Sequence, residues 1–259
     1  MENKLVFNHR FFEHICEYKK ADLGKAPLLF KLVVFLLKWK IIVLILLVFE
    51  KVMTVLLNLP IPGYKSLVSI FVTIFPGLPN MGGCYLRSLY YRGKMKKMGP
   101  NVLIDRGVQI YYPKNVELSE FCYLDKNVII AAKSAFIGKR VHIAPNVFIT
   151  GGGDFIIEDY ACIAAGSIVV TSTETLKDGT RSSGPMVPVS QRNVLSGSVV
   201  IKRDAFIAVN VTILTNSVIE EGSVVMPGSI IKGTLDPWTY YKNRMKPEAL
   251  SRKRQKLDF

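Results

Sequence analysis

The sequence of 259 residues predicts a mainly β protein, a left-handed parallel β-helix that follows an N-terminal α-helical, membrane-associated region. Three observations lead to this fold class. From residue 101 onward an aliphatic residue recurs at every sixth position, residues 27–79 are strongly apolar, and the formal net charge is +14. A charge of this size indicates an anionic partner, such as a phosphorylated ligand or an anionic membrane surface.

The period of six residues fits neither an α-helix nor a β-hairpin, but it fits short strands that turn a corner every six residues. Near the C-terminal end the aliphatic positions are Ile201, Ile207, Ile213, Ile219, Val225 and Ile231. Groups in the same phase begin at Leu118, Ile137 and Ile157, and a small residue such as Cys122 or Ala161 follows four positions later. With three hexads to a coil, the coils stack about 4.8 Å apart and bury a continuous aliphatic column.

Composition divides the chain into five parts. They are a basic N-terminal segment (1–26), a membrane-associated helical hairpin (27–79), an amphipathic basic connector (80–100), the β-helix (101–235) with a protruding loop at 171–195, and a basic C-terminal tail (236–259). The loop contains no hexads, and a loop of this length without regular structure is usually functional.

The apolar part consists of two stretches, 27–59 and 66–78, separated by "PIPG" at 60–63. Lys and Arg lie on both sides of it, which favours a cytoplasmic position for both ends. We therefore expect a hairpin that dips into one leaflet at the cytoplasmic face of the cell membrane. A single span near 41–59 and a helical layer buried in a soluble oligomer are the alternatives.

The connector at 80–100 is basic and aromatic, and it predicts a short amphipathic helix over 84–98. A helix of this type commonly lies on an anionic surface. A solvated connector is the alternative interpretation.

Scattered histidines and cysteines argue against a metal site. The β-helix region contains one histidine, His142, and the four cysteines of the chain form no Cys-x-x-Cys pair or Cys/His cluster. A zinc enzyme is therefore not expected. Nucleic acid is not expected either, because the basic residues gather at the apolar region and the tail and do not alternate with aromatic residues across the β-helix.

Three segments carry a resemblance to a known family: "VHIAPNVFITGGGDFIIEDYACIAAGSIV" (141–169), the loop "TSTETLKDGTRSSGPMVPVSQRNVLSGSVVI" (171–201), and "IAVNVTILTNSVIEEGSVVMPGSII" (207–231). Over about residues 100–245 the sequence resembles the hexapeptide-repeat acyltransferases, in particular the sugar acetyltransferases of bacterial polysaccharide and lipopolysaccharide synthesis. The resemblance implies a homotrimer with active sites between adjacent prisms, acetyl-CoA lying along the coils, no metal, and a histidine as general base.

His142 is the residue that we expect to act as this base, because a histidine titrates near neutral pH and occupies an outward position of its hexad. A solvated or structural histidine is the alternative. Many relatives carry a second histidine in the segment that corresponds to 171–175 or in the coil that corresponds to 201–206, where this chain has Glu174 and Asp204 instead. We therefore expect Glu174 to orient His142 through the second ring nitrogen.

The remaining candidate residues would bind the two substrates. For the acceptor they are Asn146, Asp178, Arg181 and Arg192. For acetyl-CoA they are Gly151 and Gly152, whose backbone N–H groups could face the thioester oxygen, and Arg244 and Lys246, which could hold its phosphates.

The sequence thus predicts an acetyl-CoA-dependent O-acetyltransferase acting on a sugar of a membrane-linked glycan or glycolipid intermediate, with no covalent intermediate. Two alternatives remain open. One is an N-acetyltransferase of a nucleotide-linked amino sugar, and the other is a β-helix scaffold that has lost its catalytic activity.

Overall fold

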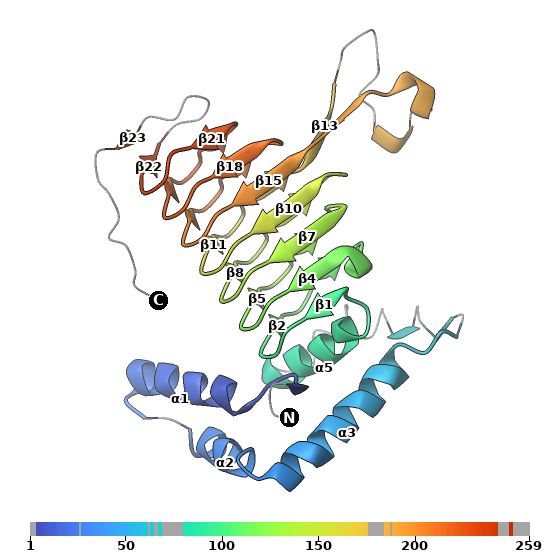
Figure 1. Cartoon of the computed structure of the whole chain (residues 1–259), viewed down its shortest axis with the longest axis vertical. Coiled ribbons are helices and arrows are strands. Elements are labelled where there is room, and N and C mark those ends of the chain that lie inside the picture. Colours follow the sequence, from blue (N-terminus) through green and yellow to red (C-terminus); the bar gives the residue numbers. More distant parts are fainter. Residues whose placement is uncertain are drawn as a thin grey trace.

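In the computed structural model, the chain forms a three-sided parallel β-helix with a layer of helices at its N-terminal end (Figure 1). The structure describes residues 4–25, 27–61, 63–64, 67–68, 80–175, 184–186, 188–242 and 249–250. The helices are α1 (His9–Leu23), α2 (Leu28–Leu36), α3 (Lys40–Leu57) and α5 (Asn80–Arg92). Single turns of 3-10 helix lie at Pro113–Asn115, Gly184–Met186 and Val189–Gln191.

Three parallel sheets form the sides of the prism, and each of the first six coils contributes one short strand to each of them. Sheet A contains β1 (Lys97–Met98), β4 (Val116–Leu118), β7 (Ser134–Ile137), β10 (Asp154–Ile157), β15 (Ser198–Ile201), β18 (Ser217–Ile219) and β21 (Thr234–Leu235). Sheet B contains β2 (Leu103–Ile104), β5 (Tyr123–Leu124), β8 (His142–Ile143), β11 (Cys162–Ile163), β16 (Phe206–Ile207), β19 (Val224–Val225), β22 (Tyr240–Tyr241) and the antiparallel β23 (Ala249–Leu250). Sheet C contains β3 (Gln109–Ile110), β6 (Ile129–Ile130), β9 (Phe148–Thr150), β12 (Ile168–Val170), β17 (Thr212–Ile213) and β20 (Ile230–Ile231).

The register of the strands confirms the six-residue repeat. In sheet B, Ile143 pairs with Leu124 on one side and Ile163 on the other, and all three side chains are fully buried. Each aliphatic position therefore stacks on its equivalent in the next coil and forms one column of the core. The chain is a parallel β-helix as expected, whereas its left-handedness stays a prediction from the repeat.

Helix α5 closes the first coil of the β-helix. Its Tyr90 and Tyr91 belong to the main hydrophobic core. Ser88 Oγ donates to the carbonyl oxygen of Val102 at 2.9 Å, and Arg87 Nε donates to that of Ile104 at 2.9 Å. Because the first coil has no preceding coil to pair with, these side chains satisfy carbonyl groups that would otherwise lack partners.

The helix expected over 84–98 therefore differs from the observed one. Helix α5 ends at Arg92, and residues 97–98 form strand β1, which pairs with β4. The physical reason is the edge of the β-helix. The aromatic face of α5 packs against the first coil of the β-helix, and the chain that follows α5 pairs with β4 as a strand.

Helices α2 and α3 occupy the first apolar stretch and are bent by 96° relative to each other. Among the described residues no single helix is long and apolar enough to cross a membrane, although this bent pair together meets the length and composition for one. The bend lies between Leu36 and Lys40, before the expected break at 60–63. Most of the expected second stretch, 66–78, lies outside the described residues.

The loop expected at 171–195 leaves the prism as an antiparallel hairpin of β13 (Ser172–Glu174) and β14 (Val194–Ser196). Figure 1 shows that it projects away from the three sheets. Residues 176–183 and 187 lie outside the described part of the chain.

Candidate active site

His142 begins strand β8 and lies on the outer surface of sheet B. Its neighbours in the same ladder are Tyr123 of β5 and Cys162 of β11. The next residue, Ile143, points into the core, and side chains alternate along a strand, so His142 must point outward. Its side chain is 43% exposed, which leaves it accessible to a ligand.

Asp125 is the carboxylate that lies beside this histidine. Its Oδ2 atom is 3.4 Å from His142 Nε2, and its Oδ1 atom accepts the backbone N–H of Lys126 at 2.7 Å. The turn after β5 thus holds the carboxylate, which is only 13% exposed, with one oxygen directed at the imidazole. When Nε2 donates to Asp125, the neutral imidazole carries its lone pair on Nδ1.

Tyr123 fixes the plane of the imidazole. The two rings are stacked with centroids 5.0 Å apart and an interplanar angle of 8°. The hydroxyl of Tyr123 donates to Asp105 Oδ2 at 3.1 Å, and Asp105 lies 3.7 Å from the guanidinium of Arg87. Burial raises the pKa of Tyr123, as do the carboxylates of Asp125 and Asp105, so this ring stays a neutral phenol.

The arrangement can move a proton from an acceptor to the imidazole. His142 Nδ1 can accept a proton from an incoming hydroxyl or amine, and the negative charge of Asp125 stabilises the imidazolium that results. In the described part of the chain, no group of three or more His, Cys, Asp or Glu side chains is arranged to hold a metal ion.

Glu174, which we expected to orient His142, has other partners within the chain. It lies in the projecting hairpin, where its carboxylate accepts Arg192 Nε at 2.8 Å and the backbone N–H of Gly184 at 3.1 Å. These two hydrogen bonds hold the pKa of Glu174 below its ordinary value. In a single chain the hairpin thus brings Glu174 and Arg192 together, and the carboxylate at His142 is that of Asp125.

The glycine bend occupies the corner between sheets C and A, whereas His142 lies on sheet B. Gly152 donates its N–H to Ser172 Oγ at 2.7 Å, so this donor, which we expected at the thioester oxygen, is engaged within the chain. Gly151 has a φ of 111°, a backbone conformation that residues other than glycine rarely adopt. These glycines thus form the base of the projecting hairpin.

Asn146 occupies the corner after β8. It has a φ of 58°, and its side-chain oxygen accepts Asn127 Nδ2 at 3.1 Å. Asparagine tolerates this left-handed conformation, so Asn146 has a structural role at the corner in addition to the expected contact with the acceptor. Asp178, Arg181, Arg244 and Lys246 lie outside the described residues.

Sequence reasoning missed Asp125 and Tyr123. The signal was present in the repeat, because Tyr123 precedes Leu124 as His142 precedes Ile143, and equivalent positions of successive coils lie side by side. One extra residue between Ile130 and Ile137 makes the two positions 19 residues apart, which hides the relation when only exact multiples of six are compared.

Comparison with known proteins gives relatives of one enzyme class, although no family model matches. A dTDP-4-amino-4,6-dideoxy-D-glucose acyltransferase of Escherichia coli is 27% identical over 146 residues, which cover 56% of this chain and 76% of the relative. WbbJ of Escherichia coli strain K12, provisionally named a lipopolysaccharide biosynthesis O-acetyl transferase, is 28% identical over 160 residues, covering 59% and 67%.

A solved structure agrees with these relatives. It is a variant of AntD, an N-acyltransferase from Bacillus cereus, in complex with dTDP and coenzyme A. It matches with a TM-score of 0.58 and 27% identity over 62% of this chain and 85% of AntD. The resemblance to the hexapeptide-repeat acyltransferases is thereby confirmed, and so is the enzyme class, acyltransferase.

Proposed function

We propose that this hexapeptide-repeat acyltransferase transfers an acetyl group from acetyl-CoA to a sugar hydroxyl of a membrane-linked glycan or glycolipid. The observation that carries the proposal is the pair of His142 and Asp125 on the open face of sheet B, since a sugar hydroxyl needs a base at neutral pH before it can attack a thioester.

The step needs no covalent enzyme intermediate. His142 Nδ1 takes the proton of the acceptor hydroxyl while the oxygen attacks the thioester carbonyl carbon. Asp125 stabilises the imidazolium across the 3.4 Å contact to Nε2. When the carbon–sulfur bond breaks, the imidazolium returns the proton to the departing thiolate. His142 is then neutral again, and the products are the acetyl ester and free CoA.

The donor is proposed from the coenzyme A in AntD and from the charge of this chain. Exposed Lys232 and Lys242 lie in the last coil, which leads into the basic segment at 243–256. Cations at this end suit the phosphates of an acyl-CoA. Arg244 and Lys246 belong to the same segment and stay candidates for this contact.

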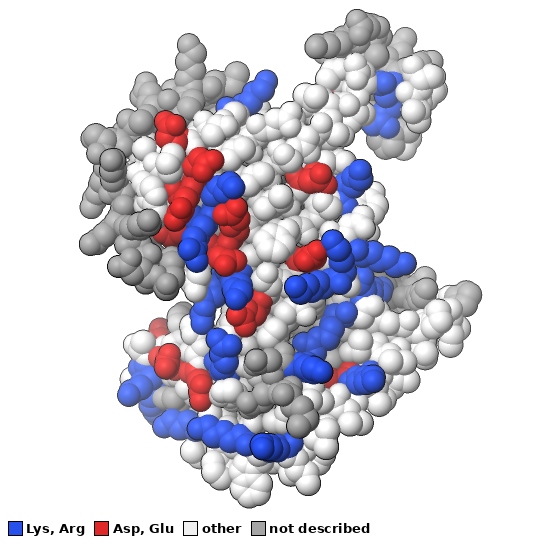
Figure 2. All heavy atoms as spheres, viewed as in Figure 1, with Lys and Arg blue, Asp and Glu red and all other residues white. Residues whose placement is uncertain are grey.

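The helical layer supports the proposed position at the cytoplasmic face of the membrane. On helix α3 most of the exposed side chains are apolar: Ile41, Leu44, Ile45, Val48, Phe49, Val52, Val55 and Leu56. Lys31, Lys38, Lys40 and Lys51 are also exposed, and Figure 2 shows a row of basic side chains along the helical end of the molecule. Apolar side chains flanked by lysines match a helical surface that enters the headgroup region of an anionic leaflet.

A homotrimer is proposed from the projecting hairpin. Met186 and Val189 on it are 86% and 84% exposed, and Val194 and Leu195 are about half exposed. A second copy of the chain is the partner that would cover these side chains and give the open site at His142 a second wall. Light scattering of the purified protein tests this stoichiometry, and a mass of one or two chains would contradict it.

The activity is tested by mass spectrometry of acceptors incubated with acetyl-CoA and the protein in vesicles. We expect acetylation of a lipid-linked glycan and its loss in His142→Ala. Acetylation of soluble nucleotide sugars alone would contradict the membrane-linked acceptor. No transfer to any acceptor with any acyl-CoA would contradict the activity itself.

A second candidate is N-acylation of a nucleotide-linked amino sugar. Two relatives favour it: AntD, whose structure holds dTDP, and the dTDP-4-amino-4,6-dideoxy-D-glucose acyltransferase. The same imidazole would accept a proton from the attacking amine. The product distinguishes the two candidates, because hydroxylamine cleaves an ester and leaves an amide intact.

A further inference from the structure

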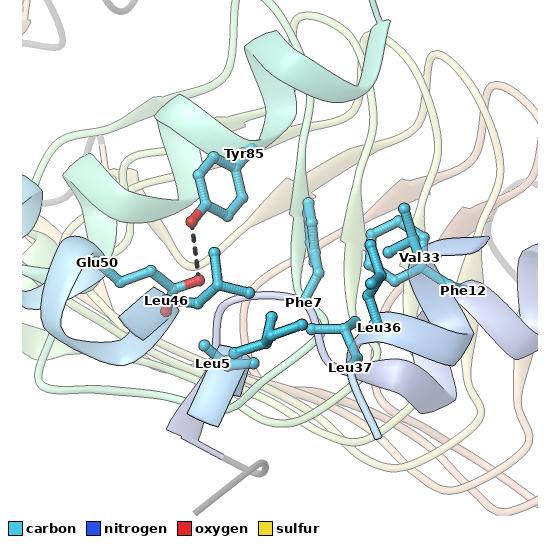
Figure 3. Close-up of a pocket in the computed structure, with 10 residues that line it drawn as sticks. Leu5, Phe7, Phe12, Val33, Leu36, Leu37, Leu46, Glu50 and Tyr85 are labelled. Atoms are coloured by element: carbon cyan, nitrogen blue, oxygen red, sulfur yellow. Dashed lines mark hydrogen bonds between the residues drawn. The ribbon is translucent and has the colours of Figure 1, made fainter. Parts of the chain in front are cut away.

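The helical layer forms a half-open apolar cavity of about 360 Å³ that plays no part in the chemistry at His142 (Figure 3). A volume of this size lies within the usual range of small-ligand sites, roughly 300–1,000 Å³. Its walls come from the N-terminal segment and from α1, α2, α3 and α5. The lining side chains are Leu5, Phe7, Phe12, Val33, Leu36, Leu37, Ile42, Leu46, Glu50 and Tyr85.

The polar groups at one end of the cavity are satisfied by the protein itself. Glu50 Oε1 accepts the hydroxyl of Tyr85 at 2.9 Å, and Glu50 Oε2 accepts the backbone N–H of Val6 at 2.9 Å and Arg92 at 3.2 Å. A ligand therefore meets hydrocarbon walls and gains no charge partner from Glu50. This chemistry favours an uncharged, flexible hydrocarbon chain over a sugar or a nucleotide.

The cavity adjoins the exposed apolar surface of the helical layer. Leu36 lines the cavity and is also 37% exposed, so it belongs to both. On α3, Ile42, Leu46 and Glu50 line the cavity at intervals of four residues, and the adjacent Ile41 and Ile45 face outward. A chain leaving a membrane on which this surface rests could thus enter the cavity without crossing water.

We propose that the cavity binds the hydrocarbon chain of the lipid carrier to which the acceptor sugar is attached. This inference rests on the proposed membrane-linked acceptor and adds the part of the acceptor that the β-helix does not bind. Helix α5 connects the two sites, since its Tyr85 faces the cavity and its Arg87 reaches Asp105 beside Tyr123. Strand β2 under α5 is two strands from β8, or about 10 Å at the usual strand spacing.

Binding of farnesyl phosphate to the full chain, measured by titration calorimetry, tests the proposal without any turnover. Two variants fill the cavity from different helices, Leu36→Trp and Leu46→Trp. Each has a matched control that places the same side chain at an exposed position of the same helix outside the cavity lining, Leu28→Trp and Leu44→Trp. We expect both filling variants to weaken binding by at least about tenfold and both controls to stay within about twofold of the unmodified chain.

A diazirine analogue of farnesyl phosphate gives a second measurement on the unmodified chain, independent of how the variants fold. Photolabelling is expected on peptides of α2 and α3, and labels confined to the β-helix would overturn the proposal. Equal weakening by fillers and controls would also overturn it. Binding of butyl phosphate as tight as that of farnesyl phosphate would overturn the proposal, because it would show recognition of the phosphate alone. Binding of palmitate as tight as that of farnesyl phosphate would also overturn it, because it would show a site for the acyl chains of bulk lipid.

The outcome is separable from that of the proposed function. If farnesyl phosphate binds in the cavity but no sugar is acetylated, the proposed function fails and the lipid site stands. If a water-soluble analogue of the acceptor is acetylated equally well by Leu36→Trp and the unmodified chain, while a lipid-linked acceptor is acetylated more slowly by the variant, both are supported.

Discussion

Replacing Asp125 by Asn tests the catalytic pair most directly. Asparagine keeps an oxygen for the N–H of Lys126, which Asp125 Oδ1 accepts at 2.7 Å, so the turn is preserved. Its amide NH₂ then faces His142 Nε2 in place of a charged oxygen at 3.4 Å. The substitution removes the charge that stabilises the imidazolium, and it favours the tautomer with its proton on Nδ1, the wrong nitrogen for a base.

The size of the effect follows from the contact distance and the exposure. Two unit charges about 4 Å apart attract by ~1 kcal/mol in water and by ~4 kcal/mol at an effective dielectric constant of 20. Since the imidazole is 43% exposed, the lower half of this range applies. A loss of about 1–2 kcal/mol corresponds to a decrease in kcat of about 5–30-fold, and the tautomer change adds to it. We expect kcat to fall at least about tenfold with KM little changed.

The assay is release of free CoA, measured with a thiol reagent at saturating acetyl-CoA. Asp154→Asn is the matched control, because Asp154 is an exposed aspartate on sheet A that accepts a hydroxyl from Ser134. It is expected to leave kcat unchanged. If Asp125→Asn retains full kcat while His142→Ala has none, the carboxylate has no part in the reaction and the mechanism proposed above is wrong.

Three further predictions concern the scaffold. Gly153→Ala places a Cβ against a backbone carbonyl oxygen and should destabilise the fold by about 1–3 kcal/mol or more in urea unfolding. Gly152→Ala should leave the stability unchanged, because its Cβ meets only Ser172 Oγ and Ser196 Oγ, each at an ordinary contact distance of 3.8 Å. Burial raises the pKa of Cys122 from its ordinary 9.0 to about 12. The contribution of this thiol to the stability of the fold is therefore full below pH 9 and is lost as the pH rises from 9 toward 12. At pH 9, iodoacetamide should label Cys16 in the folded chain and Cys122 only after unfolding. Glu50→Ala leaves a guanidinium without its buried partner and should cost about 3–5 kcal/mol in the same unfolding assay.

The β-helix is predictable from sequence because its periodicity is carried by the residues that form the core. Ile143, Ile163 and Ile207 recur because each fills the same place in a successive coil, and their burial is complete. A sequence pattern that records burial directly therefore determines strands, register and core together.

The structure at the N-terminal end of the β-helix is harder to predict from sequence, because it depends on contacts between the helices and the first coil. The aromatic residues of α5 look amphipathic in sequence, and nothing local reveals that the edge of the first coil will bury Tyr90 and Tyr91. The bend after Leu36 contains no proline or glycine from which it could be predicted. It follows from the packing of α2 and α3 around Leu5, which forms one buried cluster with Leu37 and Val43.

The candidate site shows why a titratable residue can be recognised while its partners are missed. His142 stands out as the one histidine of the repeat, but the residues that define its chemistry come from the previous coil, where only the register places them. Tyr123 stacks on the ring, and Asp125 lies 3.4 Å from Nε2, where it can accept a proton that this nitrogen carries. In a stacked repeat the neighbours that matter are one coil away in sequence, so catalytic partners are best sought at the equivalent position of the adjacent coil, with insertions removed. By that rule Cys162, which pairs with His142 on its other side, is the next position at which to test a contact with an acceptor.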